Sequence, residues 1–440
     1  DGRLSENYVP PSGSPMNYPQ TNFDFYPFCG IHRPVLLYAI PNEGLRDITV
    51  RTSIKDTTGI LDVIIETVNL NDVYVNLSLK GFGSEFTNTS NIEQNIQKMT
   101  LEVKEANFWN TETPNLYDLT VDIVKGDSVI DSYSLKVGIR TIEVKEDKLL
   151  LNGKPVYLTG FGRHVDFPIT GRGYVPAVII KDYSLMKWIG ANSFRTSHYP
   201  YSEQMMDLAD RLGFLVIDEI PAVGLTFKKD VIGRQLELCN QYIEELIKRD
   251  KNHPSVIMWS LANEPHSSLK SREFFKTLYD NTRRLDNSRP ITIVHMMAVK
   301  DKAFEFCDVL CINRYYGWYM QPGNLDEACE ILSKEMDKIY EKHRKPIILS
   351  EFGADTIPGW HSQPPEMFSE EYQADFLRKY IDVCRSKPYV IGEHVWNLCD
   401  FKTSQGIMRM GSMNHKGVFT RDRRPKMAAH LLRKLWKEKD

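Results

Sequence analysis

From about residue 146 onward, short apolar runs alternate with stretches of helical periodicity, and no other feature of the sequence constrains the fold as strongly. Most of the connections are amphipathic: in EEYQADFLRKYIDVC, Tyr372, Phe376 and Tyr380 share one face of a helix. Eight strand–helix units in roughly 300 residues predict a closed (β/α)8 barrel. The eight runs are PVYLTGFGRH, ANSFRTSHYP, FLVIDEIPA, VIMWSLANEP, ITIVHMM, VLCINRYY, PIILSEFGAD and YVIGEHVWNLCD.

A doubly wound open sheet is the alternative for such an alternating chain. Open sheets that bind dinucleotides carry a glycine-rich phosphate-binding turn after their first strand. No such turn follows the run PVYLTGFGRH. The barrel is therefore the favoured fold for residues 146–440.

The sequence before residue 146 has a different pattern of apolar and polar residues. RDITVRTSI, ILDVIIETV, VYVNLSLKG, MTLEVKE and YDLTVDIVKGDSVIDSYSLKVGIRTI alternate apolar and polar residues and are separated by Asn, Gly and Asp turns. Short strands at that spacing predict an antiparallel β-sandwich over residues 41–145. Residues 1–40 are rich in Pro, Tyr and Phe, and we expect irregular chain there that closes with one strand, RPVLLYAI.

The overall composition argues against several classes of partner. A chain of 440 residues, 42% of them hydrophobic and 26% charged, is typical of a soluble globular protein with two or three domains. Its formal net charge of −3 argues against a basic face for nucleic acid. No apolar run reaches the length of about eighteen residues that a membrane span needs. We therefore expect neither a nucleic acid nor a membrane as a partner.

The cysteines and the first residues bear on the compartment. Seven cysteines form an odd set without the spacing of a metal site, so we expect free thiols in a reducing environment. The start, DGRLSENYVPPSGSPMNYPQ, has neither the basic beginning nor the apolar run of a signal peptide. These two features predict a cytoplasmic location.

In a barrel of this kind the reacting groups lie at the C-terminal ends of the strands. No serine or cysteine there stands beside a histidine base, and there is no HExxH pair for zinc. Carboxylates, amides and aromatic side chains dominate, and these are the groups that glycoside cleavage and sugar binding need. The strand ends carry His164, Arg195, His198, Asp218, Glu219, Asn263, Glu264, Asn313, Tyr315, Tyr316, Glu351, Glu393, Trp396 and Asp400.

Glycoside cleavage requires two carboxyl groups on opposite sides of the sugar ring. Glu264 lies at the end of the fourth apolar run and Glu351 at the end of the seventh, so the two would face each other across the barrel mouth. We expect a separation of about 5–5.5 Å, which is that of a retaining pair. Asn263, directly before Glu264, is placed to donate to a sugar hydroxyl.

The residues alone leave alternatives open. Glu219 and Glu393 occupy similar strand ends and compete with Glu351 for the role of nucleophile. His198 could brace the barrel mouth instead of binding a substrate. His164 and His198 could hold a metal together with Glu219, but their scattered spacing does not favour it. We predict no metal and no cofactor.

Eight strings of the sequence closely resemble the β-glucuronidases of glycoside hydrolase family 2, in that family's order. They are GFGRH, ANSFRTSHYPYSE, VIDEIPAVG, RDKNHPSVIMWSLANEP, INRYYGWY, SEFGAD, EHVWNLCDF and NHKGVFTRDRRPK, and the resemblance runs from about residue 22 to the C-terminus. It implies that the sandwich before the barrel is immunoglobulin-like. Relatives begin with a complete jelly-roll sandwich, of which residues 1–40 resemble only the last segment.

The resemblance implies roles for individual residues. It makes Glu264 of NEP the acid/base and Glu351 of SEFG the nucleophile. It assigns Asn414 and Lys416 of MNHKG to the substrate carboxylate, with Arg409 nearby, although an N-x-K sequence taken alone is more often a solvated basic turn. The other positions that resemble the family's sugar pocket are Asp24, His164, Asn263, Tyr315, Tyr319 and Trp396.

By resemblance, then, the chain is expected to be a retaining exo-glycosidase that hydrolyses β-D-glucuronides without a cofactor. A carboxylate at C6 distinguishes a glucuronide from a glucoside or galactoside, and Lys416 would favour the acid sugar. The alternatives are a β-galactosidase or β-galacturonidase of the same family, or a fragment that binds glucuronides without turning them over. A homo-oligomer, dimer or tetramer, is also expected by resemblance.

Overall fold

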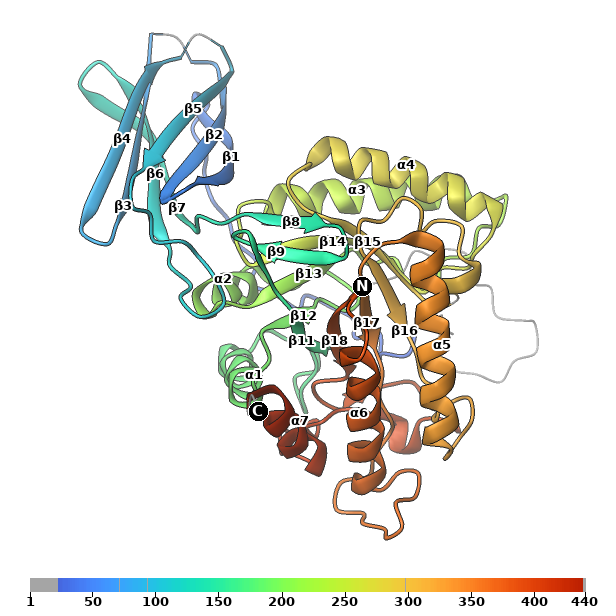
Figure 1. Ribbon diagram of the computed structural model, residues 1–440. Coiled ribbons are helices and arrows are strands. Elements are labelled where there is room, and N and C mark those ends of the chain that lie inside the picture. The colour runs from blue at the N-terminus through green and yellow to red at the C-terminus, as the bar shows by residue number, and fades with distance from the viewer. Residues whose placement is uncertain (1–22, 71, 93, 297, 438–440) are drawn as a thin grey trace.

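The computed structural model describes residues 23–70, 72–92, 94–296 and 298–437, which form a β-sandwich followed by a closed barrel (Figure 1). This arrangement confirms the predicted fold class. Of the segment 1–40, which we expected to be a jelly-roll remnant, residues 1–22 lie outside the described residues.

The sandwich consists of two antiparallel sheets around a core of aliphatic side chains that includes Leu61, Val63, Leu77 and Val121. The alternating sequence explains this core, because every second residue of a strand points to the same face. One sheet has the order β1–β2–β5 and the other β4–β3–β6–β7. The strands are β1 (Gly44–Lys55), β2 (Thr58–Val68), β3 (Tyr74–Gly81), β4 (Ser84–Asn91), β5 (Ile96–Val103), β6 (Tyr117–Lys125) and β7 (Ser128–Val137).

Two strand predictions in this region differ from the structure. The sequence of β4, SEFTNTSN, is polar almost throughout and was not expected to be a strand, yet it pairs with β3 at the edge of its sheet. The strand predicted for RPVLLYAI is wrong: residues 33–40 form no ladder, and Val35, Leu36 and Leu37 are largely exposed. Apolar composition favours a strand only where a neighbouring strand is there to pair with it.

Eight parallel strands close the barrel, one at each of the predicted apolar runs. β18 pairs with β11 and completes the ring. The strands are β11 (Leu158–Gly162), β12 (Ser193–Arg195), β13 (Leu215–Glu219), β14 (Val256–Asn263), β15 (Ile291–His295), β16 (Leu310–Asn313), β17 (Ile347–Glu351) and β18 (Val390–Trp396).

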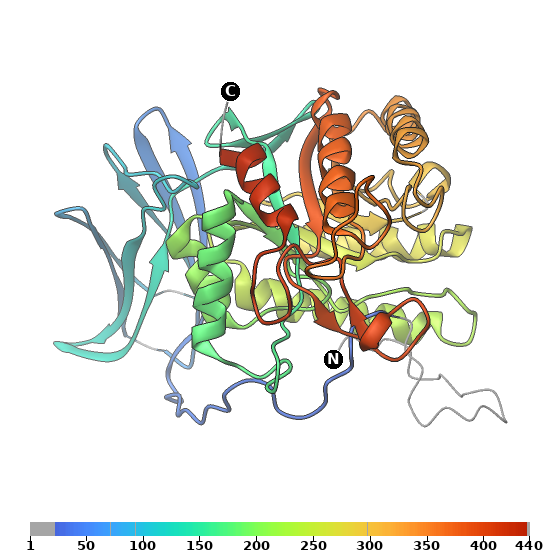
Figure 2. The same cartoon turned by 90° about the horizontal axis from the view of Figure 1, so that it is seen from below.

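Amphipathic helices surround the barrel. In α6 the buried residues include Tyr372, Phe376 and Tyr380, as the sequence predicts. α7 lies against α1 and α6 (Figure 2), and the short helix η1 stands between β15 and β16. The helices are α1 (Pro176–Ile189), α2 (Glu203–Leu212), α3 (Ile232–Asp250), α4 (Leu269–Leu285), η1 (Ala298–Lys300), α5 (Leu325–His343), α6 (Glu370–Arg385), η2 (Met410–Ser412) and α7 (Met427–Lys437).

A small antiparallel sheet closes the N-terminal end of the barrel. Leu149 and Leu151 of this sheet belong to the same core cluster as Leu215 and Ile257, which lie at the starts of their barrel strands. The C-terminal strand ends are thus left as the accessible end. The sheet has the order β10–β9–β8, from β8 (Ile142–Lys145), β9 (Lys148–Leu151) and β10 (Lys154–Pro155).

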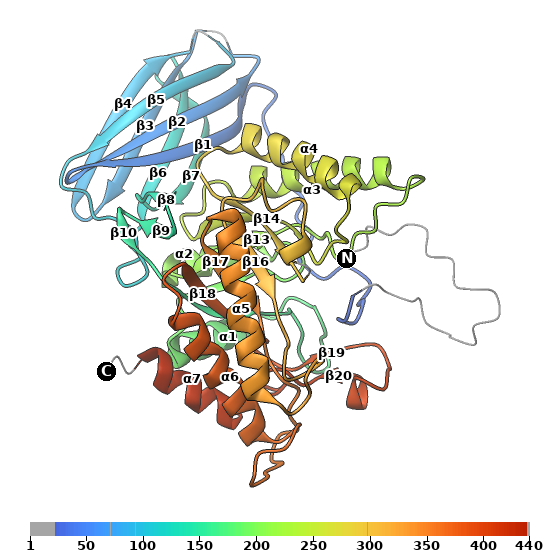
Figure 3. The same ribbon diagram turned by 45° about the vertical axis from the view of Figure 1, so that its right-hand side comes forward.

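A short hairpin lies at the C-terminal end of the barrel. It pairs β19 (Phe401–Lys402) with β20 (Met413–Asn414), and Figure 3 shows it far from the sandwich. Phe25 forms an antiparallel bridge with Thr403, next to this hairpin. The bridge brings the N-terminal segment to the strand ends, so that residues far apart in the sequence can share one site.

The loop before β14 ties the barrel to the sandwich. The side-chain amide of Asn252 donates to the carbonyl oxygen of Ile48 (2.8 Å) and accepts from the N–H of Val50 (2.9 Å). Lys251 forms an ion pair with Asp47. The two bonds of Asn252 join a side chain to the backbone and the ion pair joins two side chains, which makes the relative position of the two parts specific.

Two properties bear on the cellular environment. Within the described residues, no helix combines the length and the apolar character needed to cross a bilayer. All seven cysteines are unpaired; Cys29 is exposed, Cys329 is half-buried and the other five are buried.

Candidate active site

A cavity of about 800 Å³ lies at the C-terminal ends of the barrel strands. Phe23 and Phe25 of the N-terminal segment form part of its wall. Of the eleven predicted site residues, ten line the cavity, and Lys416 is the exception. The ten are Asp24, His164, Asn263, Glu264, Tyr315, Tyr319, Glu351, Trp396, Arg409 and Asn414.

Glu264 follows directly after β14 and is held by both its backbone and its side chain. Its N–H donates to the carbonyl oxygen of Val294 (2.8 Å), at a backbone φ of 48° that residues with a Cβ seldom adopt. Asn313 donates from Nδ2 to Glu264 Oε1 (2.8 Å) and to Asn263 Oδ1 (3.2 Å). Ser350 donates to Asn313 Oδ1 (2.9 Å), which fixes the orientation of that amide. The geometry leaves the second oxygen of Glu264 for the cavity.

Glu351 is the last residue of β17 and lies on the wall of the same cavity, 4% exposed. The hydroxyl of Tyr315 donates to Oε2 (2.7 Å), and Nη2 of Arg195 donates to Oε1. Burial raises the pKa of Glu351, while Arg195 and His198 act in the opposite direction and the charge of Glu264 raises the pKa further. The Glu351 carboxyl group is therefore subject to opposing effects, and the charge of Arg195 is the largest of those that stabilise its ionised form.

Glu219, the first alternative nucleophile, is fully buried and does not line the cavity. Nη1 of Arg195 donates to both of its oxygens (2.9 and 2.7 Å), and its Oε1 lies 2.7 Å from Nδ1 of His198. Although burial opposes it, Arg195 lowers the pKa of Glu219 to about 2. Glu219 is thus a charged anchor for Arg195. His198 both contacts this anchor and lines the cavity.

Glu393, the second alternative, is also fully buried and lies outside the cavity wall. Tyr157 donates to it (2.8 Å), as do Arg385 of α6 (2.9 Å) and Trp436 of α7 (2.8 Å). Its carboxylate therefore joins β18 to the surrounding helices. This geometry gives it no access to a sugar in the cavity.

His164 lies on the cavity wall and is held by Tyr199. Burial lowers the pKa of His164 well below its usual value, so the ring is neutral. The hydroxyl oxygen of Tyr199 accepts the N–H of Val165 (3.0 Å) and lies 3.0 Å from His164 Nδ1. Nε2 is buried and has no partner among the described residues. A contact of this ring with a sugar hydroxyl stays a prediction.

Aromatic rings form an apolar part of the wall. Trp396 stacks on His198, with ring centroids 5.3 Å apart and an interplanar angle of 18°, and meets His164 edge-on at 5.2 Å. Phe25 lies 4.7 Å from the His164 ring. Such faces pack well against the C–H groups of a pyranose ring.

A different part of the wall carries paired charges. Arg409 donates from Nε to Asp24 Oδ1 (2.6 Å), and Asn414 donates from Nδ2 to Asp24 Oδ2 (2.7 Å). Nη2 of Arg409 also donates to the hydroxyl of Tyr319 (2.9 Å). Asp24 thus orients both a cation and an amide at the edge of the cavity.

Lys416 lies behind this wall and is 1% exposed. Its ammonium donates to the hydroxyl of Tyr319 (2.9 Å) and to Oδ2 of Asp355. The same nitrogen lies 4.7–5.7 Å from the ring centroids of Tyr315, Trp318 and Tyr319. Lys416 is therefore a buried, paired charge and not a solvated surface lysine. Its contact with a substrate stays a prediction.

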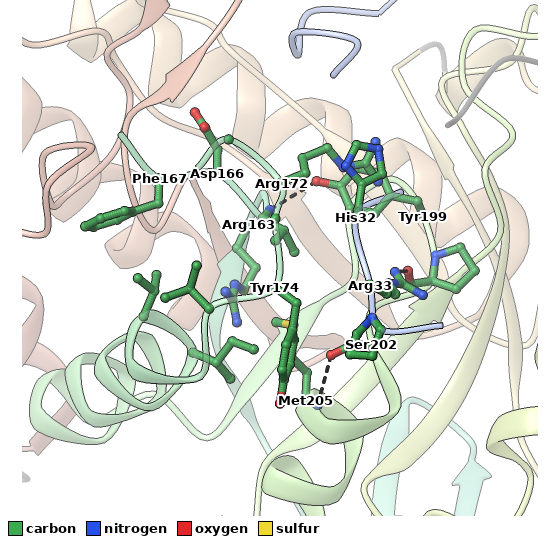
Figure 4. Close-up of a pocket in the computed structure, with 18 of the residues that line it drawn as sticks. His32, Arg33, Arg163, Asp166, Phe167, Arg172, Tyr174, Tyr199, Ser202 and Met205 are labelled. Atoms are coloured by element: carbon green, nitrogen blue, oxygen red, sulfur yellow. Dashed lines mark hydrogen bonds between the residues drawn. The ribbon is translucent and has the colours of Figure 1, made fainter. Parts of the chain in front are cut away.

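A second cavity, of about 590 Å³, lies beside the N-terminal segment, with Arg163 and Asp166 on its wall (Figure 4). Its buried carboxylates form ion pairs with arginines. Asp182 pairs with Arg163 and Arg423, and Asp166 pairs with Arg421. These carboxylates are occupied by their arginine partners, so the chemistry is expected in the first cavity.

In the part of the chain that the structure describes, one group of side chains has possible metal-ligating atoms close together: Asp207, Asp210 and His253. Although burial opposes it, Asp210 raises the pKa of His253 to about 9. Nδ1 of His253 lies 2.5 Å from Oδ2 of Asp210, so two of these atoms already form an ion pair with each other. The set considered from the sequence, His164, His198 and Glu219, is not such a group.

Three residues that hold the site received no role from the sequence: Arg195, Asn313 and Asp355. Arg195 and Asn313 lie at strand ends, and this position can be predicted from the sequence. Which carboxylate each of them contacts depends on the register of the strands. Asp355 belongs to the string SEFGAD, and its partners lie about sixty residues further along the chain.

Comparison with known proteins gives a family for both parts of the chain. The profile described as "Glycosyl hydrolases family 2, TIM barrel domain" matches residues 142–439, and "Glycosyl hydrolases family 2" matches residues 44–140. A β-glucuronidase of Mus musculus is 42% identical over 424 residues, which cover 94% of this chain and 64% of the mouse protein. A β-glucuronidase of Paenibacillus borealis is 44% identical over 428 residues, which cover 94% of this chain and 71% of the bacterial protein.

Solved structures share the fold. The β-D-glucuronidase of Dictyoglomus thermophilum superposes with a TM-score of 0.91 at 42% identity, covering 99% of this chain and 76% of that one. The β-glucuronidase from Ruminococcus gnavus in complex with C6-substituted uronic isofagomine has a TM-score of 0.90 at 40% identity, covering 94% and 72%. The similarity thus extends over both the sandwich and the barrel.

Proposed function

The chain belongs to glycosyl hydrolase family 2, and from this premise we propose that it is a retaining exo-glycosidase that hydrolyses β-D-glucuronides to glucuronate and the aglycone. One observation carries the proposal: two carboxyl groups and a pair of cations adjoin a single cavity large enough for a sugar. The similarity to proteins named β-glucuronidase supports it.

In the first step, ionised Glu351 attacks C1 of the glucuronide while protonated Glu264 gives its proton to the aglycone oxygen. The C1–O bond breaks, and a glycosyl ester of Glu351 forms. Arg195 and Tyr315 hold the carboxylate of Glu351 in place through their hydrogen bonds. Asn313 orients Glu264 in the same way.

In the second step, water attacks C1 from the face that the aglycone has left. Glu264, now ionised, takes a proton from this water, and the ester bond to Glu351 breaks. Glucuronate is released with its original anomeric configuration. Two inversions at one carbon give net retention, which proton NMR of the first product formed detects directly.

Recognition of the acid sugar is assigned to Asn414, Lys416 and Arg409. The hydroxyl oxygen of Tyr319 accepts from both cations, so an anionic oxygen is favoured in this region. A charge-assisted hydrogen bond contributes roughly 1.5–3 kcal/mol. A neutral sugar would leave this contribution unused.

The test is a comparison of p-nitrophenyl β-D-glucuronide, glucoside, galactoside and galacturonide as substrates of the same preparation. We expect the highest kcat/KM on the glucuronide. Preference for the galactoside or the galacturonide would replace the proposal with one of the other two hydrolase activities. Tight binding of glucuronate without turnover of any substrate would identify a binding protein.

We also propose a division of the chain into residues 1–40, resembling the last segment of a jelly roll, a sandwich over residues 41–145 and a catalytic barrel over residues 146–440. The strand positions support the last two parts. Limited proteolysis tests the division, because the first cuts should fall near residues 40 and 145.

The proposal includes a cytoplasmic location and a homo-oligomer, dimer or tetramer. Unpaired cysteines support a reducing compartment, and the oligomer rests on the resemblance of the sequence. Light scattering coupled to size-exclusion chromatography tests the assembly, and a monomeric mass would contradict it.

A further inference from the structure

Asp355 connects the strand that carries Glu351 to the loop that carries Lys416. It lies four residues beyond Glu351 and is 2% exposed. Its Oδ1 accepts the backbone N–H of His415 (2.8 Å), and the N–H of Thr356 donates to the carbonyl oxygen of His415 (3.0 Å). The two segments therefore form one hydrogen-bonded unit.

Asp355 also pairs with Lys416 and lies close to Arg409, the two cations assigned to recognition of the acid sugar. The ammonium of Lys416 donates to its Oδ2, and Nη1 of Arg409 lies 3.6 Å from the same oxygen. A buried ammonium is costly unless a carboxylate is paired with it. Because Asp355 does not line the cavity, it stabilises the charge of Lys416 without occupying ligand space.

A second buried lysine shows what a purely structural pair looks like. Lys426 donates to Asp400 Oδ1 (2.8 Å) and to two backbone carbonyl oxygens (2.9 and 3.0 Å), so all three of its ammonium protons have acceptors. Lys416 has two acceptors, Tyr319 and Asp355, and no third one among the described residues. Lys416 thus has one oxygen acceptor fewer than Lys426, and the proposed function assigns this place to the C6 carboxylate of the substrate.

We propose that Asp355 is a positioning residue that determines the selectivity of the site for uronates. It fixes the ammonium of Lys416 relative to the strand end that carries Glu351. The C6 carboxylate and C1 of one sugar are then placed by a single rigid unit. The inference rests on the proposed function and adds a residue that the substrate does not touch.

The test is Asp355→Asn, assayed on p-nitrophenyl β-D-glucuronide and on the glucoside. The amide keeps the size of the side chain and an acceptor for the His415 N–H, but it carries no charge. We expect kcat/KM for the glucuronide to fall by about tenfold, mainly through a higher KM, as for the loss of one charge-assisted hydrogen bond. Turnover of the glucoside should change by less than about threefold.

Asp286→Asn is the matched control, because it removes a buried carboxylate that pairs with Arg289, and neither of these residues lines the cavity. It should lower the melting temperature and leave the glucuronide-to-glucoside ratio of kcat/KM unchanged.

In a Lys416→Met background, Asp355→Asn should no longer change this ratio, because the group that it positions is gone. An equal fall of the ratio in both backgrounds, or in Asp286→Asn, would show that Asp355 has only a general structural role and would overturn the inference.

The remaining outcomes separate the inference from the proposed function. If Asp355→Asn increases the ratio, Asp355 competes with the substrate for Lys416 and does not position it. If the wild type prefers the glucuronide and Asp355→Asn leaves the glucuronide-to-glucoside ratio of kcat/KM unchanged, the inference alone is wrong. A wild type without glucuronide hydrolysis overturns the proposed function itself. Asp355→Glu keeps the charge and should retain a higher ratio than Asp355→Asn; the reverse order would also overturn the inference.

Discussion

Glu351 and Glu393 are buried glutamates on neighbouring strands, yet of the two only Glu351 lines the cavity. We expect Glu351→Gln to lower kcat on a glucuronide by about three orders of magnitude or more, because an amide cannot form the glycosyl ester. Glu393→Gln should keep a kcat/KM near that of the wild type at a temperature where it is folded. Initial rates with a chromogenic glucuronide check both. The opposite pattern would make Glu393 the nucleophile.

Lys416→Met removes the buried charge and keeps an unbranched side chain. Because a C6 carboxylate would lose its charged donor, we expect kcat/KM on the glucuronide to fall by about one to two orders of magnitude. The weak activity on the glucoside, which has no carboxylate, should change much less. Paired assays with the two p-nitrophenyl glycosides give the ratio. Equal losses on both substrates would remove the carboxylate-binding role from Lys416.

For individual residues, the sequence predicts which side chains come together at the candidate site but not which of them form hydrogen bonds or ion pairs with each other. Glu264 and Glu351 could be located, because the ends of barrel strands converge whatever the details of packing. The burial of Lys416 could not be predicted from the sequence. It depends on the loop that carries Lys416 folding back onto the segment after β17, where the ammonium lies close to three aromatic rings. Arg195 illustrates the same limit: its position at a strand end was visible, but its simultaneous contact with Glu219 and Glu351 was not.

β11 and β12 approach each other closely at Gly160, where a Cβ would lie 2.0 Å from the carbonyl oxygen of Ser193. We expect Gly160→Ala to lower the free energy of unfolding by about 1–3 kcal/mol, because the two strands must move apart. Thermal unfolding followed by circular dichroism measures the effect. In Gly233→Ala, on α3, nothing lies within 4 Å of the new Cβ, so this control should be as stable as the wild type or slightly more so. Equal stability of the two variants would contradict the close approach of the strands.

Among the elements, the barrel strands were the easiest to predict. Each is a buried apolar run flanked by a helical pattern, and burial on both faces removes polar residues from the run. The sandwich was harder to predict, because its edge strand β4 needs no apolar residues, while the apolar segment 33–40 has no strand beside it. Pairing partners decide such cases, and a local pattern does not contain them.

The stability of the whole molecule should depend on pH through His253, which lies in the loop that contacts the sandwich. Although burial opposes it, Asp210 raises the pKa of His253 from 6.5 to about 9 in the folded protein. A raised folded pKa stabilises the protein fully below the unfolded pKa, and this stabilisation disappears as the pH rises through the folded pKa. We expect a loss of the order of 3 kcal/mol in the free energy of unfolding between about pH 6 and about pH 9.5.

Urea unfolding at the two pH values measures this loss. His253→Gln should lose stability at the lower pH and show a correspondingly smaller pH dependence. The exposed pair of His361 with Glu371 provides a control, because His361→Gln should leave the pH dependence almost unchanged. The same pH dependence in His253→Gln and the wild type would contradict the assignment.

For the molecule as a whole, the change in the hydrophobic pattern near residue 146 predicts a sandwich followed by a barrel, but not how the two are attached. The attachment depends on a few side chains, above all Asn252, whose amide contacts the backbone of β1. A single asparagine in a loop carries no pattern that would reveal this contact. The periodicity of the sequence therefore predicts the order of the two parts along the chain, whereas their relative position depends on individual polar residues.

Cys29, the exposed thiol of the chain, lies four residues after Phe25, which lines the candidate active-site cavity. Because five of the other cysteines are buried and Cys329 is half-buried, a maleimide dye would attach to the native protein at essentially one place. We expect its emission to respond to the filling of the cavity that Phe25 lines. Sugar binding could then be titrated by fluorescence in variants that no longer turn over, such as Glu351→Gln, without introducing a new labelling site.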